Sequence, residues 1–166
     1  MVREFASSLG VRQDAGDVEY VGTMRSPYDR SHLVELYAQA ASSFQLDPTT
    51  DSVIAFARAS GAGQQAASAP VLDRATLEQR ARAFLAHADP ATDLARLAPT
   101  AAAKASSTAT TQEAVFRWED AQHSRPARCP VAGQPCADPG KLLFVQIVLD
   151  STGRIISYTN TLGFAH

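Results

Sequence analysis

The sequence predicts an α+β protein of two repeats, each a helix packed on a small antiparallel β-sheet. Three observations favour this fold class. Residues 141–160 read as a β-hairpin, the stretch between Asp73 and Pro90 reads as an amphipathic helix, and the elements of the two halves of the chain follow the same order. A repeated supersecondary unit buries its apolar face poorly alone, so two copies packed together would share one core.

The hairpin is the clearest element. Alternate residues along its first strand are apolar, which is the period of a β-strand: Leu143, Val145, Ile147 and Leu149. Residues 150–153 supply turn chemistry, because Gly153 can take a positive φ that other residues resist. Residues 154–161 resume in β-rich composition and complete the hairpin.

The first half begins with a helix over residues 2–11, whose apolar positions follow the spacing of one helical face: Val2, Phe5, Ala6 and Leu9. Strands are predicted at residues 17–24, 32–46 and 52–58, with turns at 25–30 and 47–51. The alanines of residues 32–46 would also suit a helix. Val34, Tyr37 and Phe44, between two turn signals, favour a strand.

The second half begins after residues 60–70, which are small and polar and lack periodicity, as a linker does. Asp73 or Thr76 caps the following helix, and Thr76 with Gln79 has the form of a capping box. One face of this helix is apolar: Leu77, Ala81, Phe84, Leu85 and Ala88. A shorter turn of helix follows through Leu94 and Leu97, and residues 113–120 form a strand that carries the single tryptophan.

The predicted organisation is a first repeat at 1–59, a linker at 60–73 and a second repeat at 74–166. Two segments interrupt the second repeat: residues 100–111 are low in complexity, and residues 121–140 form an irregular insertion. The two repeats match best at their turns, because the dipeptide Leu46-Asp47 enters one turn and Leu149-Asp150 enters the other.

The stretch LDSTGRIISY at 149–158 resembles the closing hairpin of PepSY-type domains. The helix ending in AFLAHAD and the strand VFRWED also stand in the PepSY order, so the resemblance covers residues 2–58 and 74–160. The first copy departs from it, with Asp51 and Ser52 where the second has Gly153 and Arg154. The resemblance implies a noncatalytic, extracytoplasmic unit of the kind found in protease propeptides and secreted or membrane-tethered proteins, where it binds or restrains a partner.

Composition excludes several classes of protein. Hydrophobic residues make up 45% of the chain and charged residues 19%, which is ordinary for a globular domain. A net charge of −2 offers no general attraction for nucleic acid or anionic lipid. No apolar run approaches the roughly 18 residues of a membrane span. The opening MVREFASSLG lacks a signal-peptide pattern, so either the protein is cytoplasmic or its export segment lies outside this sequence.

The two cysteines bear on this choice. Cys129 and Cys136 bound the segment CPVAGQPC, which is stiffened by two prolines and favours a disulfide clip. Because disulfides persist in oxidising compartments, the clip favours an extracytoplasmic location. The alternative is a pair of reduced cysteines on a cytosolic loop. A structural zinc site needs four closely spaced ligands, and only His123 lies nearby, so neither a metal nor a cofactor is expected.

Candidate partner-binding residues come from two groups. Phe116 and Trp118 share a strand face, and the hairpin brings Tyr158 near them, so the three form either core or the floor of a peptide groove. Arg125 and Arg128, which flank the cysteine segment, either attract an acidic partner or belong to a solvated loop.

The four histidines are scattered, and the chain has no G-x-S-x-G, P-loop or H-E-x-x-H motif. The function expected is a noncatalytic, extracytoplasmic module that binds or regulates a protein or peptide partner. The alternative is a carrier with an apolar pocket between helix and sheet, which an apolar cavity with a few converging polar groups would indicate. An enzyme ranks third and would need a strongly perturbed titratable group in a cleft.

Overall fold

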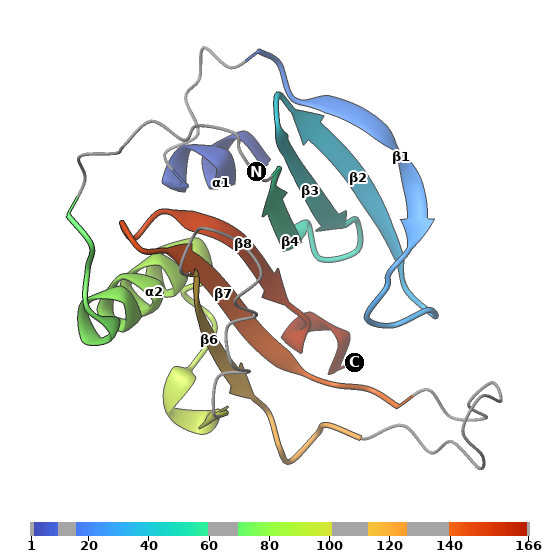
Figure 1. The fold of residues 1–166 in the computed structure, drawn as a ribbon. Helices are drawn as coiled ribbons and strands as arrows, with labels where there is room; N and C mark the ends of the chain where they lie inside the picture. The colour runs from blue at the N-terminus through green and yellow to red at the C-terminus, as the bar shows by residue number, and fades with distance from the viewer. Residues whose placement is uncertain (1, 10–15, 60–69, 101–112, 126–139, 166) are drawn as a thin grey trace, which may run out of the picture.

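A computed structural model describes residues 2–9, 16–59, 70–100, 113–125 and 140–165 of the 166-residue chain. Its main feature is one antiparallel sheet of eight strands, in the order β1-β2-β3-β4-β8-β7-β6-β5 (Figure 1). The strands are β1 Glu19–Arg25, β2 Leu33–Gln39, β3 Ser42–Asp47, β4 Ser52–Arg58, β5 Ala98–Pro99, β6 Glu113–Glu119, β7 Phe144–Asp150 and β8 Ile155–Asn160. The helices are α1 Val2–Ser8, α2 Arg74–Ala88 and the 3-10 turns η1 Leu94–Arg96 and η2 Leu162–Ala165.

The prediction of an α+β protein with two repeats, each a helix on its own small sheet, is wrong. β4 pairs with β8 and places Phe56 opposite Tyr158, so strands from both halves belong to one continuous sheet. The protein is therefore mainly β, and α2 is its one long helix within the described ranges. The physical reason is that the β4–β8 pairing satisfies backbone groups that would otherwise form two exposed sheet edges.

The main core lies between one face of this sheet and the two α-helices. Rings from distant segments meet here: the centroid of Phe5 in α1 lies 5.8 Å from that of Phe84 in α2 and 5.3 Å from that of Tyr158 in β8. The strands contribute their alternate apolar side chains to the same cluster: Phe44, Phe56, Phe116, Trp118, Val145, Ile147 and Leu149. We call this side of the sheet the helix-covered face.

The opposite face has a smaller core at one end, formed by Val34, Ile54, Leu143 and Phe164. The connection between β1 and β2, residues 26–32, folds over this end, and we call it the strap. The ring of His32 in the strap stacks on Phe164 of η2, with centroids 4.5 Å apart. Tyr28 meets Phe144 edge-on and its hydroxyl lies 3.3 Å from Oγ1 of Thr159. The strap and η2 therefore cover this end of the sheet, although neither segment has regular apolar periodicity.

Most elements of the sequence prediction are confirmed. The helix α2 is capped by Asp73, whose carboxylate accepts from the N–H of Thr76 at 2.7 Å, and it ends at Asp89 before a proline. β4 has the predicted bounds, and β7 and β8 form the hairpin predicted within residues 141–160. Gly153 has a φ of 85°, as its turn requires.

The single strand predicted at residues 32–46 is wrong. The chain turns at Ala40 and Ala41, so β2 and β3 form a hairpin in which Gln39 lies opposite Ser42. Ala40 adopts a φ of 49°, in the left-handed region that alanine rarely enters. The turn contains no glycine or asparagine, the residue types from which a turn of this kind is predicted. Pairing of the flanking strands, rather than turn propensity, therefore stabilises it.

Some predictions concern residues outside the described ranges. The linker at 60–73 is described only from residue 70, and most of the low-complexity segment 100–111 and of the insertion 121–140 also lies outside. None of the helices described in the structure has both the length and the apolar character that a membrane crossing needs.

Candidate binding groove

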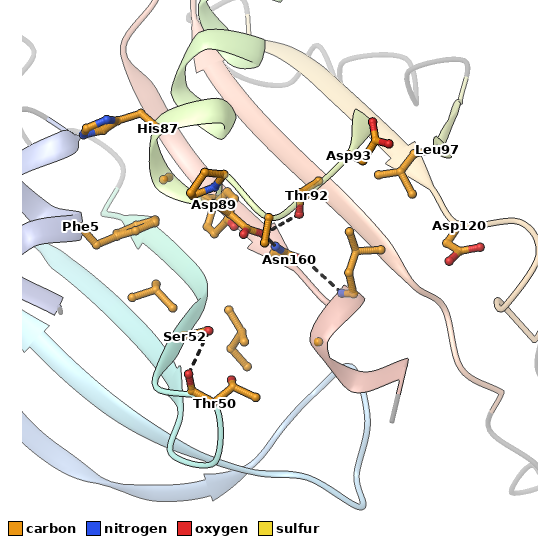
Figure 2. A pocket seen from close by; sticks show the side chains of 18 of the residues that line it. Phe5, Thr50, Ser52, His87, Asp89, Thr92, Asp93, Leu97, Asp120 and Asn160 are labelled. Atoms are coloured by element: carbon orange, nitrogen blue, oxygen red, sulfur yellow. Dashed lines mark hydrogen bonds between the residues drawn. The ribbon is translucent and has the colours of Figure 1, made fainter. Parts of the chain in front are cut away.

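A groove of about 1030 Å³ opens at one end of the helix-covered face. It is bounded by α1, the C-terminal end of α2, the turn that leads to η1, the β3–β4 turn, the end of β8 and η2 (Figure 2). The turn after β6, which carries Asp120 and His123, completes the lining. The groove therefore lies where the helices no longer cover the sheet.

One end of the groove is apolar. Phe5 of α1, whose ring packs against Phe84 and Tyr158, lines this end, and Thr50 and Ser52 of the β3–β4 turn lie at the rim (Figure 2). Val53 follows Ser52 along β4, is 7% exposed and faces the helix-covered core, whereas the side chain of Ile54 belongs to the smaller core on the opposite face. The small parts of Phe5 and Val53 that the core leaves uncovered can contact the apolar part of a ligand.

The floor of the groove is a polar network that joins α2 to β8. Oδ2 of Asp89 accepts hydrogen bonds from Oγ1 of Thr92 and from Nδ2 of Asn160, the latter at 2.7 Å. The backbone N–H of Asp89 also closes the last turn of α2 on the carbonyl of Leu85. Asp89 thus ends the helix through its backbone N–H, and its carboxylate fixes that helix end to a strand residue 71 positions further along the chain.

Tyr158 lies beside this network and is 1% exposed. Burial raises the pKa of its phenol far above the ordinary value, although a hydrogen bond with the side chain of Asn160 acts in the other direction. The phenol therefore stays protonated and neutral under physiological conditions. Its ring belongs to the core, against Phe84 at 5.6 Å between centroids.

The other end of the groove is acidic, with Asp93 and Asp120 near Leu97 (Figure 2). Oδ1 of Asp93 caps η1 by accepting from the N–H of Ala95 at 3.0 Å. Asp120 accepts from the N–H groups of Gln122 and His123, and its Oδ2 lies 2.8 Å from Nδ1 of His123. The hydrogen bond with the side chain of His123 lowers the pKa of Asp120, so this carboxyl is ionised at neutral pH.

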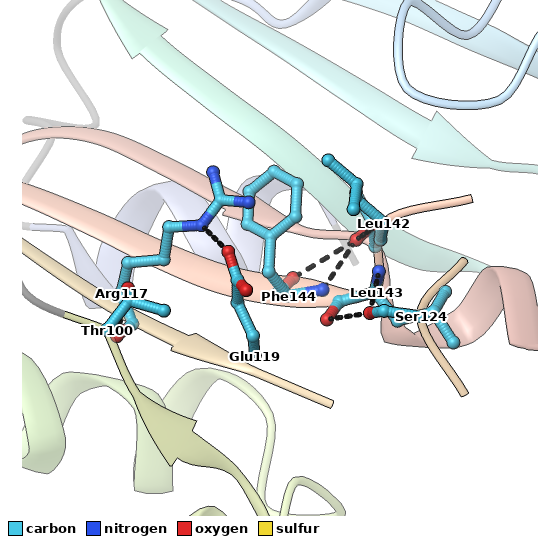
Figure 3. A network of polar contacts seen from close by, with 8 residues as sticks. Thr100, Arg117, Glu119, Ser124, Leu142, Leu143 and Phe144 are labelled. Atoms are coloured by element: carbon cyan, nitrogen blue, oxygen red, sulfur yellow. Dashed lines mark hydrogen bonds and ion pairs between the residues drawn. The ribbon is translucent and has the colours of Figure 1, made fainter. Parts of the chain in front are cut away.

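A network on the opposite face of the sheet holds the turn that carries Asp120. The N–H of Asp120 bonds to the carbonyl of Leu143 at 2.9 Å, and Oγ of Ser124 accepts from the N–H of Leu143 at 3.0 Å. Beside it, Nε of Arg117 donates to Glu119 at 2.7 Å, and its guanidinium lies 3.7 Å from the ring centroid of Phe144 (Figure 3). The acidic end of the groove is therefore fixed to β6 and β7.

The residues predicted to bind a partner are placed differently from one another. Phe116 and Trp118 are buried at 4% and 2% exposure, with the guanidiniums of Arg74 and Arg82 above their rings. They belong to the core under α2, as does Tyr158, which is 1% exposed and lies next to the groove. Arg125 is exposed and pairs through its backbone with Lys141. Arg128, Cys129 and Cys136 lie outside the described residues.

Sequence reasoning missed the residues that shape the groove: Asp89, Thr92, Asp93, Asp120 and Asn160. The sequence does indicate that a helix ends and another begins here, because Asp89-Pro90 is a helix-ending pair and Asp93 is a helix-capping residue type. Nothing local joins them to Asn160 or Asp120. Within the described ranges, no group of three or more His, Cys, Asp or Glu side chains could hold a metal ion.

Comparison of the chain with protein-family models, with curated proteins and with solved structures found no match.

Proposed function

We propose that this protein is a noncatalytic binding or regulatory module that receives a segment of a partner polypeptide in the groove. The observation that carries the proposal is the groove itself, which is open to solvent and combines an apolar end with an acidic end. A polypeptide segment offers both kinds of group within a few residues, together with backbone donors and acceptors.

The contacts around the groove support a preformed site. Asp89 fixes the end of α2 to β8, Asp93 fixes η1, and Asp120 fixes the turn after β6. Each of these hydrogen bonds holds backbone that borders the groove. A site whose walls are fixed before binding loses less entropy when a partner binds.

The competing function is a carrier that encloses a small apolar ligand between helix and sheet. Such pockets surround most of the ligand surface and have only a few polar groups. Here many polar side chains line the groove beyond its apolar end, including Asp89, Asp93, Asp120, His87 and Asn160. This lining favours a polypeptide.

The proposal also includes location. The resemblance of residues 149–158 to the closing hairpin of PepSY-type domains supports an extracytoplasmic module of a secreted or membrane-anchored protein. A free-thiol assay of natively produced protein tests this part, because blocked thiols that reductant releases would indicate a Cys129–Cys136 disulfide and an oxidising compartment. Two free thiols in protein recovered from the cytosol would contradict it.

Panning of a random peptide library against the purified chain tests the binding function. Gly163→Trp and Ala91→Trp each add a bulky side chain to the groove lining, and a Cβ at Gly163 meets no atom within 4 Å. Ala83→Trp is the matched control, since Ala83 is an exposed residue of α2 outside the groove. We expect selected peptides to bind the two groove variants at least tenfold more weakly and the control unchanged. Peptides that bind all three variants like the parent would overturn the proposal.

A further inference from the structure

We infer that the groove selects a polypeptide segment in which a lysine or arginine accompanies an apolar side chain. The inference rests on the proposed function and specifies the chemistry of the partner. The apolar side chain would lie against Phe5 and Val53, and the cationic group would lie at the end that carries Asp93 and Asp120.

The charges that line the groove are unequal. Asp89, Asp93 and Asp120 contribute three carboxylates, and Arg96 contributes one guanidinium. His87 and His123 add charge only when they are protonated. At neutral pH the lining therefore repels an acidic segment and attracts a basic one, and the attraction is strongest where the charges converge on a partly enclosed surface.

The three carboxylates are not equally available to a ligand. Asp89 is half-buried and its Oδ2 already accepts from Thr92 and Asn160, while Oδ2 of Asp120 is engaged by His123. Asp93 is exposed, and only its Oδ1 accepts a hydrogen bond from a described residue. Oδ2 of Asp93 can accept from an incoming ammonium or guanidinium without breaking a contact of the fold.

The two ends of the groove also differ in the elements that form them. The apolar end is formed by side chains of regular elements, α1 and β4, whereas the acidic end is formed by turns whose carboxylates are anchored by backbone N–H groups. An anchored carboxylate keeps its position when it binds a cation, so little side-chain entropy is lost. A segment with both an apolar and a cationic side chain can therefore form favourable contacts at both ends of the groove at the same time.

The experiment uses peptides that are selected from a random library on the parent protein and that Gly163→Trp weakens. Asp93→Asn and Asp120→Asn remove one charge each and keep an oxygen that can accept the capping hydrogen bonds. Asp73→Asn is the matched control, because Asp73 caps α2 in the same way, by accepting from a backbone N–H at 2.7 Å, and lies outside the groove. Fluorescence anisotropy measures Kd for each labelled peptide at 50 and 300 mM salt.

We expect lysine and arginine to be enriched among the selected peptides. Asp93→Asn and Asp120→Asn should each weaken binding about fivefold at low salt and less at high salt, while Asp73→Asn leaves Kd unchanged. Groove-dependent peptides without enrichment of basic residues, or with Kd unaffected by both groove substitutions, would overturn this inference and leave the proposed function standing. Failure to select any groove-dependent peptide would overturn both.

Discussion

The two faces of the sheet are closed in different ways. On the helix-covered face, α1 and α2 place regularly spaced apolar side chains against the alternating residues of β3, β4, β6, β7 and β8. On the opposite face, a core of four buried residues is closed by the strap and η2, which have no such periodicity. Leu162 packs against both cores, and it also lines the groove.

The two sides of the sheet differ in how easily they can open locally. The helix-covered core depends on many side chains, so the loss of one contact changes its stability without changing its shape. Besides hydrogen bonds, the strap and η2 are held over the sheet by a small number of ring contacts, mainly His32 on Phe164 and Tyr28 on Phe144. We therefore expect the strap side to open locally at a lower free energy than the helix-covered side, and the groove wall formed by η2 to respond to changes in the strap.

The largest expected effect is that of Phe84→Ala in the helix-covered core. Phe84 contacts the rings of Phe5 and Tyr158, so its truncation leaves a cavity between α1, α2 and β8. We expect the free energy of unfolding to fall by about 3–5 kcal/mol. Urea denaturation measures it, with Gln79→Ala on the exposed side of α2 as the control. A loss below about 1 kcal/mol would show that this core is not the main source of stability.

Phe164→Ala tests the smaller core. Phe164 is 1% exposed, but only three other buried residues, Val34, Ile54 and Leu143, share its core in the described part of the chain. We expect a loss of about 2 kcal/mol, below the usual cost of removing a core phenylalanine, because the site can collapse. Hydrogen exchange should also accelerate at Thr161 to Phe164 while α2 stays protected. Equal acceleration in α2 would mean that the two cores unfold as one unit.

Tyr28→Phe removes one polar contact of the strap and keeps the ring on Phe144. The hydroxyl of Tyr28 lies 3.3 Å from Oγ1 of Thr159, so the expected cost is about 0.5–1 kcal/mol. Hydrogen exchange of residues 26–32 should rise, whereas Tyr20→Phe, an exposed tyrosine on β1, should leave it unchanged. An unchanged rate in Tyr28→Phe would show that the ring contact alone holds the strap.

Acidification should give the smallest effect, acting on the strap through Asp29. Burial acts to raise the pKa of Asp29, but hydrogen bonds from Ser31 and the proximity of His32 outweigh it and hold the pKa below the ordinary value of 3.8. A lowered pKa in the folded state means that the ionised form stabilises the strap above about pH 4 and that this contribution is lost as the pH falls through the folded-state pKa.

Asp29→Asn should therefore flatten the dependence of strap hydrogen exchange on pH below about 4. Asp150 in the β7–β8 turn provides the comparison, because hydrogen bonds from Thr152 and Arg154 also lower its pKa against the effect of burial. Asp150→Asn should leave the pH dependence of the strap as it is. A strap whose exchange depends on pH equally in both variants would exclude Asp29 as the cause.

Local chemistry was enough to predict most elements of the fold. The cap at Asp73, the period of β7 and the glycine turn at Gly153 act within a few residues, and the structure confirms each. The turn at Ala40 was missed because alanine has no preference for the conformation it adopts there. The candidate binding residues Phe116 and Trp118 lie in the core, and no local pattern shows whether α2 covers an aromatic pair.

The sequence by itself determined where most strands, the helix cap and the glycine turn form, because these depend on neighbours a few positions apart. Tertiary structure decided that β4 pairs with β8 to make one sheet, that Asn160 meets Asp89, and that Phe164 lies under His32. Each of these contacts joins residues far apart in the chain, and several competing pairings would satisfy the same local patterns. Only the packing of the whole chain selects among them, and that selection creates the groove.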